Sequence, residues 1–275
     1  MFISGPTLAE PPIDDRFALL YEDEVLAVVD KSGNLPCHAG GRYREHTLAR
    51  LLETRAGFRE IHWVNRLDRE TSGTVLVAKT AEAASRLGKA LMAGRFQKTY
   101  RVLVEGPWRD APELRATGKI YPVSGREVLK MRLFIPGDSN VRVGDIISEH
   151  TVRGPGQEAE TRFRFLGERD GIVLLEACPR TGRVHQIRAT LKALGYPVVG
   201  DKLYGPDETL YARMCNDALS EDDRRRLRMP RQALHAFRLA FPHPYSGTLL
   251  EVEAPLPEDM LVFAQAIENR QSEPL

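Results

Sequence analysis

Hydrophobic and polar positions are arranged along this chain in runs that predict many short strands and few helices. Continuous apolar, β-branched runs at Val25–Asp30, Ile61–Val64 and Thr74–Ala78 are typical of buried strands. Further runs predict strands over Thr99–Glu105, Val128–Phe134, Thr161–Leu166, Ile172–Ala177, Leu234–Phe241 and Thr248–Ala254. Because most strands follow one another directly, the pattern predicts an α+β fold with a largely antiparallel mixed sheet flanked by helices.

Helical spacing of apolar residues occurs in three segments, each with a capping signal at its start and a glycine at its end. They run from Thr47 to Gly57, from Thr80 to Gly94, and from Thr181-Gly182 to Gly195. After Gly205 a polar helical insert follows, with a capping box at Ser220–Asp223. The apolar stripe of the third helix is predicted to consist of Val184, Ile187, Leu191 and Leu194.

The N-terminal segment, residues 1–22, contains three prolines and predicts an arm laid over the surface of one domain at 23–275. No apolar run approaches the roughly 20 residues that span a bilayer, and the first residues lack a secretory pattern. The cysteines, three in number, form no Cys-x-x-Cys pair, which argues against a disulfide framework or zinc knuckle. We therefore expect a cytoplasmic protein without a membrane partner.

The net charge of the chain excludes few classes of function. The chain has 275 residues with a net charge of +1, and its arginines far outnumber its lysines. Arg offers a planar fork that suits phosphates and base edges, although a GC-rich genome explains the same bias equally well. The composition is therefore compatible with RNA binding but does not indicate it.

Several short motifs of other chemistries fail in context. The Gly-rich stretch Gly154–Ala159 enters a predicted strand instead of a helix, so we interpret it as a turn and not a dinucleotide site. The Ala78–Thr80 junction lacks the glycines of a phosphate-binding loop. No histidine is spaced with another ligand as a metal site requires, so no metal is expected.

Three polar segments stand where the chain enters or leaves a strand or helix, and such junctions are common positions for functional sites. They are Asn65–Gly73, Lys98–Arg101 and Pro179–Arg188. Taken alone, Asp68 is typical of a turn and Tyr100 of a half-buried strand. Arg183 is predicted in the first turn of the third helix, either in a surface ion pair or directed into a cleft.

The same segments resemble the signatures of RluA-like RNA pseudouridine synthases. NRLDRETSGTVLVAK (Asn65–Lys79) resembles HRLDxxTSGxxLxAK, and KTYRVLVEG (Lys98–Gly106) is similar to the second family motif. TGRVHQIRATLKALGYPVVGDKLYG (Thr181–Gly205) and the closing LHAFRLAFPHP…LEVEAPLP (Leu234–Pro257) resemble the later ones. The motifs occur in family order between Val25 and Met260. Departures from them are Asn65 for His, Val184 for Thr and Thr190 for His.

This resemblance implies isomerisation of uridine to pseudouridine, for which no cofactor is needed. It implies that Asp68 is the essential carboxylate, acting either as nucleophile at C1′ or as base at C2′. Arg183 is predicted to pair with Asp68 and keep it ionised. Tyr100 is predicted to stack on the uracil and to place its hydroxyl near C5.

The resemblance also implies a central RNA-binding cleft into which the target uridine is flipped. Arg66 is predicted to fill the space that the uridine vacates. Arg69, Lys98, His185 and Arg188 are predicted to contact the RNA backbone. The basic run Arg224–Arg228 is either a further RNA-facing helix or a solvated surface. We expect a monomer without an S4-type RNA-binding module or an obligate protein partner.

The RNA target and two rival functions stay open. Gly33–Leu48 resembles the segment of family members that modify tRNA anticodon stem-loops, which favours tRNA slightly over large-subunit rRNA. One rival is a non-catalytic RNA-binding protein or folding chaperone on the same scaffold. The other is a hydrolase or glycosidase with two carboxylates, for which Glu70 is the only acid near Asp68.

Overall fold

The computed structural model describes residues 9–124, 132–137, 151–152, 154–207 and 209–271. Its strands form one sheet with the order β1-β2-β4-β11-β5-β10-β9-β6-β7, while β3, β8 and β12 pair with β4, β6 and β11. Among these strands only β4 and β11 run parallel. The structure confirms the predicted α+β class with a mostly antiparallel mixed sheet.

The bounds of the elements follow the predicted ones closely where the pattern was clear. The strands are β1 (Phe17–Glu22), β2 (Leu26–Lys31), β3 (His62–Trp63), β4 (Ser72–Ala78), β5 (Gln97–Glu105), β6 (Glu113–Ser124), β7 (Arg132–Pro136), β8 (Thr151–Val152), β9 (Gln157–Arg169), β10 (Ile172–Pro179), β11 (Leu234–Pro242) and β12 (Leu249–Glu253). The helices are α1 (Leu48–Arg55), α2 (Ala81–Met92), α3 (Gln186–Ala193), α4 (Leu210–Cys215), α5 (Glu221–Leu227) and α6 (Glu258–Gln271). Of the strand predicted at Val128–Phe134, residues 128–131 lie outside the described residues.

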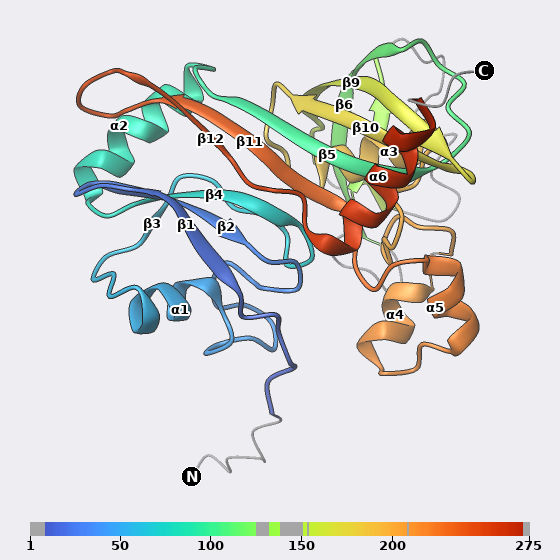
Figure 1. Cartoon of the computed structure of the whole chain (residues 1–275), viewed down its shortest axis with the longest axis horizontal. Coiled ribbons are helices and arrows are strands. Elements are labelled where there is room, and N and C mark those ends of the chain that lie inside the picture. The colour runs from blue at the N-terminus through green and yellow to red at the C-terminus, as the bar shows by residue number, and fades with distance from the viewer. Residues whose placement is uncertain (1–8, 125–131, 138–150, 153, 208, 272–275) are drawn as a thin grey trace.

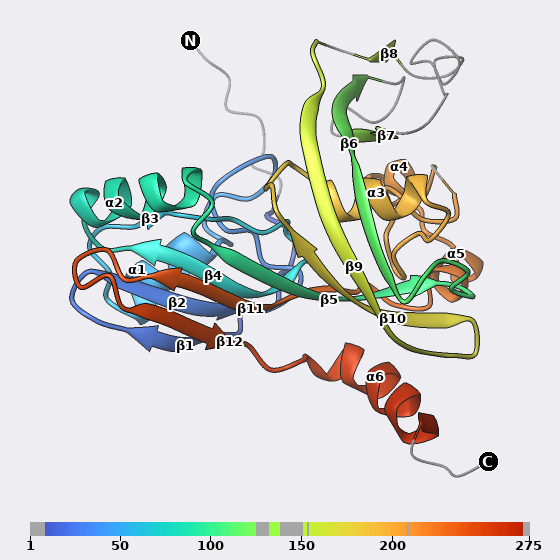
Figure 2. The same cartoon turned by 90° about the horizontal axis from the view of Figure 1, so that it is seen from above.

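The continuous apolar runs of β2 and β4 are explained by helices on both faces of the first half of the sheet (Figure 1). Ala27 and Val29 of β2 pack in one cluster with α1, whereas Leu26 and Val28 pack in another with α2. A strand that is buried on both faces has no polar side to expose, so its pattern does not alternate. A third and larger core covers β5, β9, β10 and α3 in the other half (Figure 2).

Helix ends were predicted correctly where the signal was local. The hydroxyls of Thr47 and Thr80 accept hydrogen bonds from backbone amides one turn later, at 3.3 and 3.2 Å. Gly57 and Gly94 end α1 and α2 with φ of 73° and 70°, conformations that favour glycine. The Ser220 capping box also forms, at the start of α5.

The predicted N-terminal arm is wrong for its last residues. β1 pairs antiparallel with β2 along Phe17–Glu22 and forms the edge of the sheet, so the domain does not begin at residue 23. Half of that strand is exposed, although its sequence, FALLYE, is largely apolar. Helix α6 has no counterpart in the prediction. Within the described part of the chain, no helix is long and apolar enough to cross a membrane.

Candidate active site around Asp68

Asp68 lies on the loop between β3 and β4, and hydrogen bonds on both sides hold this loop in place. Its own carbonyl accepts from Thr71 N at 3.1 Å, which closes a turn. Asn65, at the position where the family motif has His, accepts from Leu76 N of β4 at 2.7 Å. The ammonium of the fully buried Lys31 donates to the carbonyl of Arg69 at 3.1 Å and to two further carbonyls. The loop is therefore anchored to β2 and β4.

A close backbone approach brings the segment before β11 next to this loop. Gly73 pairs with Ala236, and a Cβ atom on Gly73 would lie 2.3 Å from the Ala236 carbonyl oxygen. Its φ of 106° also favours glycine. Because of this approach, Gln232 reaches the loop, where its amide donates to Thr71 Oγ1 at 2.6 Å and lies 3.5 Å from Asp68 Oδ2.

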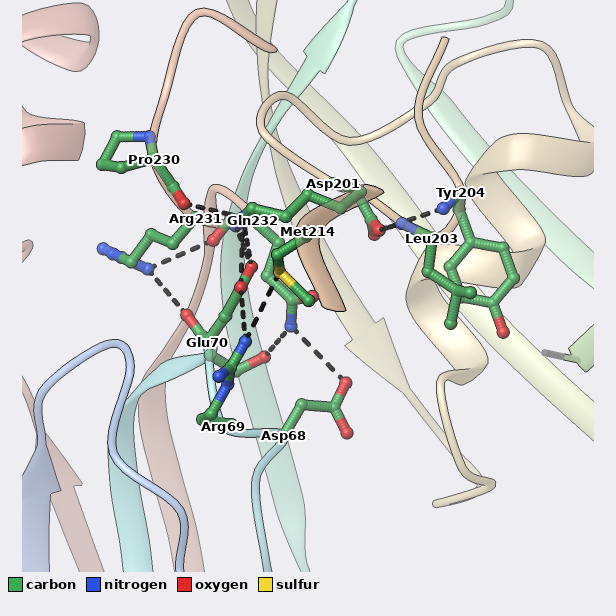
Figure 3. A network of polar contacts seen from close by, with 12 residues as sticks. Asp68, Arg69, Glu70, Asp201, Leu203, Tyr204, Met214, Pro230, Arg231 and Gln232 are labelled. Atoms are coloured by element: carbon green, nitrogen blue, oxygen red, sulfur yellow. Dashed lines mark hydrogen bonds and ion pairs between the residues drawn. The ribbon is translucent and has the colours of Figure 1, made fainter. Parts of the chain in front are cut away.

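Glu70, the nearest acid in sequence, lies in the same network of polar contacts as Asp68, in which Gln232 contacts both residues (Figure 3). Its carboxylate oxygens each lie 3.0 Å from Lys202 Nζ, and Oε1 also accepts from Arg69 at 3.0 Å. The backbone amide of Gln232 donates to Oε2 at 3.2 Å. Glu70 thus ties three segments together and does not face Asp68 as a second catalytic acid would.

Arg188, in the first turn of α3, is the cation that meets Asp68. Its Nη1 donates to Asp68 Oδ2 at 2.9 Å. Its Nε and Nη2 donate to Asp201 at 2.6 and 2.8 Å in a bidentate pair. Arg188 is 7% exposed and Asp201 0%, whereas the Asp68 side chain remains 32% exposed. The site is therefore a buried ion pair, Arg188 with Asp201, behind one accessible carboxylate, Asp68.

The predicted pairing of Arg183 with Asp68 is wrong. Helix α3 begins at Gln186, three residues later than the pattern indicated, and His185 before it has a φ of 57°. The Gln186 side chain accepts from Arg183 N at 3.0 Å and donates to Glu160 O on β9 at 2.9 Å, which fixes this start. Arg183 is left exposed, and its Nε donates to the Glu158 carbonyl. Arg188 takes the position in the first turn that was expected of Arg183.

The electrostatics of the site favour an ionised Asp68. Burial raises the pKa of Asp68, but the charge that His185 carries when it is protonated, together with the charge of Arg188, outweighs burial and holds that pKa below its usual value. Burial also lowers the pKa of His185 to about 4, so His185 is neutral at pH 7. Arg188 is therefore the cation that keeps Asp68 charged at neutral pH.

Tyr100 lies on β5 opposite Ala177 of β10 and Ala236 of β11, with its ring against the larger core. Burial, followed by the negative charge of Asp68, raises the pKa of Tyr100. Its hydroxyl therefore stays protonated at neutral pH. The structure thus brings Asp68, Tyr100 and the start of α3 near one another.

The residues predicted to contact RNA divide into two groups. Arg66 is exposed, 3.2 Å from His38 Nε2, and Lys98 forms no ion pair with any residue that the structure describes. Arg69, by contrast, is bound to Tyr43 and Glu70. His185 and Arg188 are buried against Asp68, so the structure does not offer them to an RNA backbone.

The arginines of the basic run on α5 are exposed and lie near acidic side chains, as expected of a solvated surface. Arg224 and Arg225 lie 3.9 and 3.4 Å from acids one turn earlier, and Arg226 lies 3.7 Å from Asp207. All three side chains are largely exposed. Exposed pairs of this kind contribute little to stability, and they leave less uncompensated charge for RNA.

A family model described as RNA pseudouridylate synthase matches residues 25–193 of this chain. The chain belongs to this family. It is 33% identical over 261 residues to ribosomal large subunit pseudouridine synthase D of Nitrosomonas europaea, covering 91% of this chain and 65% of that protein. It is 32% identical over 254 residues to synthase C of Pasteurella multocida, covering 92% and 69%. The chain thus spans about two thirds of each relative.

The fold agrees with this membership. A human protein, RNA pseudouridylate synthase domain containing 4, superposes with a TM-score of 0.66 at 20% identity, over 91% of this chain and 92% of that one.

Within this synthase family, the departures from the motifs have separate structural consequences. Val184 is 54% exposed, and the hydroxyl of Thr190 is buried without a hydrogen-bond partner among the described residues.

Sequence reasoning did not single out Asp201, Gln232 or Lys31. Asp201 was present in the quoted motif, directly after Gly200, but a lone Asp after Gly is usually a turn residue. Its role appears only through Arg188 and through the amides of Leu203 and Tyr204, which donate to it at 2.9 and 3.0 Å.

Among the residues that the structure describes, no His, Cys, Asp and Glu side chains cluster as a metal site would require.

Proposed function

We propose that this protein converts uridine to pseudouridine in RNA, with Asp68 as the essential carboxylate. The observation that carries the proposal is the geometry of Asp68, whose Oδ2 is held by Arg188 at 2.9 Å while its side chain stays 32% exposed. An ionised, fixed and accessible carboxylate is what the reaction needs at the sugar.

The chemistry is an isomerisation, so every atom of the substrate is kept. The N1–C1′ bond breaks, a C5–C1′ bond forms, the proton on C5 leaves and N1 gains a proton. Asp68 assists by attack at C1′ or by removal of a proton from C2′. Because Arg188 occupies Oδ2, the other oxygen, Oδ1, is the one that faces the sugar in either route. Tyr100, neutral and half-buried, supplies a flat face for the uracil.

Access to a structured RNA requires that the uridine leave its stack, which costs a few kcal/mol. Arg66 supports this step because it is exposed, lies two residues from Asp68 and has His38 as its neighbour at 3.2 Å. We propose that Arg66 fills the vacated space and that Lys98 contacts the RNA backbone. Both retain a charge that no carboxylate of the described chain pairs with.

We propose large-subunit rRNA as the substrate class, because the similar curated proteins named above carry that substrate in their names. tRNA is the second candidate, on account of the Gly33–Leu48 segment. Residues of that segment border the Asp68 loop, where Tyr43 accepts a hydrogen bond from Arg69. A segment in this place is positioned to contact the RNA beside the flipped uridine.

Tritium release tests the proposal directly. Transcripts of large-subunit rRNA and of tRNAs, labelled at uracil C5, are incubated with the protein, and released tritium is counted. Release without free uracil is expected, and Asp68→Asn should abolish it while RNA binding changes only a few-fold. Binding without release would favour the non-catalytic RNA-binding protein, and free uracil would favour the glycosidase.

The substrate is identified by mapping pseudouridines in cells with and without the gene, by carbodiimide treatment and reverse transcription. Loss of a reverse-transcription stop in large-subunit rRNA supports the proposed target. Loss confined to a tRNA would replace it with the second candidate.

A further inference from the structure

His185 occupies an unusual position at the start of α3. It is the N-cap residue, yet its side chain makes no capping hydrogen bond, and its φ of 57° lies in the left-handed region. A residue other than glycine in this conformation is uncommon and is often held there by its surroundings at functional sites. Here the ring is directed between Tyr204 and Asp68, with the side chain only 12% exposed.

The hydrogen bonds around Tyr204 determine which ring nitrogen carries the proton. The Tyr204 hydroxyl oxygen accepts from Arg132 N at 2.7 Å and lies 3.0 Å from His185 Nδ1. Among the described residues no other acceptor for the Tyr204 proton lies within hydrogen-bond distance, so donation to Nδ1 is the arrangement that satisfies both groups. A neutral imidazole with Nδ1 as acceptor carries its proton on Nε2. Nε2 lies 3.7 Å from Asp68 Oδ1.

We propose that His185, fixed as the neutral Nε2–H form by Tyr204, is a positioning residue that orients the reactive oxygen of Asp68. Arg188 holds Oδ2, and the Nε2–H group of His185 stands beside Oδ1, so the two carboxylate oxygens have different neighbours. This inference rests on the proposed function, because it assigns Oδ1 to the sugar.

The length of the contact suits this role. At 3.7 Å, Nε2 lies beyond hydrogen-bond distance of Oδ1, so the N–H group acts on that oxygen through its dipole and the oxygen keeps its lone pairs for the substrate. A charged imidazole would form an ion pair with Oδ1 and compete with the reaction. Burial opposes that charge, since it lowers the pKa of His185 to about 4. The RNA-backbone contact predicted from the sequence would instead need an exposed ring.

Nitrogen NMR tests the protonation state without reference to activity. Protein labelled with ¹⁵N-histidine, with His185 assigned by substitution, should show the neutral Nε2–H tautomer at pH 7. In Tyr204→Phe the tautomer should become mixed, because Nδ1 has lost its donor. An Nδ1–H tautomer or a charged ring in the unmodified protein would overturn the proposal, whatever the enzyme does.

Substitutions that imitate one ring nitrogen at a time provide the matched kinetic test. The amide of His185→Gln can place its NH₂ group near the Nε2 position, whereas that of His185→Asn is too short. His185→Asn should lower the single-turnover rate constant by about 10–100-fold, as a misplaced reacting group does, while His185→Gln should keep most of the rate of the unmodified protein. The RNA dissociation constant should stay within a few-fold in both.

Two results would contradict the positioning role. Equal loss of kcat in the Gln and Asn variants, with both folded by urea titration, would show that the Nε2 donor is not what matters. A rise in the RNA dissociation constant with unchanged kcat would return His185 to an RNA contact. If the unmodified protein releases no tritium, the proposed function fails, and the tautomer measurement still decides the geometry.

Discussion

Arg188 and Asp201 form a buried bidentate pair, with N–O distances of 2.6 and 2.8 Å, that leaves one guanidinium nitrogen, Nη1, directed at Asp68. Asp201 takes two of the donors, so Arg188 cannot turn to form a bidentate pair with Asp68 instead. A single contact fixes Asp68 Oδ2 and leaves Oδ1 open. Asp201 therefore sets the orientation of the candidate catalytic carboxylate indirectly, by fixing the Arg188 guanidinium that contacts Asp68.

The assignment of Arg188 is tested against Arg183, a residue of the same type on the same segment. Arg188→Lys should lower kcat by about 100-fold or more, because a lysine cannot contact Asp201 through two nitrogens and reach Asp68 as well. Arg183→Lys should change kcat less than a few-fold, since its side chain is exposed. Single-turnover tritium release measures both. The opposite order of effects would restore Arg183 as the partner of Asp68.

Asp201→Asn tests whether the second acid acts through Arg188. The amide keeps an oxygen for the amides of Leu203 and Tyr204 but removes the charge, so Arg188 is freed to shift toward Asp68. We expect kcat to fall about 10–100-fold with little change in RNA binding. Because a buried arginine loses one of its two charged partners, urea unfolding should show a loss of stability, smaller than the about 3–5 kcal/mol that leaving a buried charge unpaired costs.

The control for this variant is Asp222→Asn on α5. Asp222 also faces an arginine, Arg225, at 3.4 Å, but both side chains are about two thirds exposed. An exposed pair contributes little, so activity and stability should both stay unchanged. An Asp201→Asn protein that is as active as this control would remove Asp201 from the positioning of the site.

The part of the site that the sequence predicted correctly depends on local signals. Asp68 follows β3, and Tyr100 lies near the start of β5; both positions are visible in the pattern, and the loop between β3 and β4 was placed correctly. The choice between Arg183 and Arg188 failed because the start of α3 is set by a tertiary contact. Gln186 binds Glu160 O on β9, and His185 adopts a left-handed conformation. Neither feature changes the spacing of apolar residues along the sequence. Val184, which is 54% exposed, was wrongly counted in the apolar face of the helix.

Asp201 was missed for a related reason. It lies thirteen residues after Arg188 in sequence, and only the fold brings the two side chains together. The edge strand β1 was missed although its sequence, FALLYE, is largely apolar, because the nearby prolines favoured an irregular arm. Long-range pairings between side chains are thus the feature that the pattern of one sequence did not reveal.

The close approach of β4 and β11 at Gly73 predicts that substituting this glycine destabilises the protein, whereas substituting Gly88, which lies elsewhere, does not. Gly73→Ala places a Cβ atom 2.3 Å from the Ala236 oxygen at a φ of 106°, so it should destabilise by about 2 kcal/mol or more and lower kcat. Gly88, inside α2, has nothing within 4 Å of an added Cβ, so Gly88→Ala should stabilise by about 0.5–1 kcal/mol. Urea titration of both variants measures this. Equal effects of the two substitutions would argue against the close contact.

Asp30 on β2 predicts a pH-dependent stability. Burial raises the pKa of Asp30 to about 6, against a smaller opposing effect of Lys31. The folded state therefore binds this proton more tightly than the unfolded chain does. The stability that protonation provides is complete below the ordinary pKa of about 4 and is lost as the pH rises through about 6. At pH 7 the native protein holds a half-buried charge that costs free energy.

Asp30→Asn removes that charge and should raise the free energy of unfolding at pH 7. The gain should be about 1–3 kcal/mol, given about 1.4 kcal/mol for each pKa unit. The gain should shrink as the pH falls toward 4, where the carboxyl is protonated in the folded state and about half protonated in the unfolded chain. Urea titrations of both proteins from pH 4 to pH 8 measure the difference. Asp170→Asn, at a side chain that is 85% exposed, should follow the unmodified protein throughout. A gain that does not change with pH would mean that Asp30 is not the group that titrates.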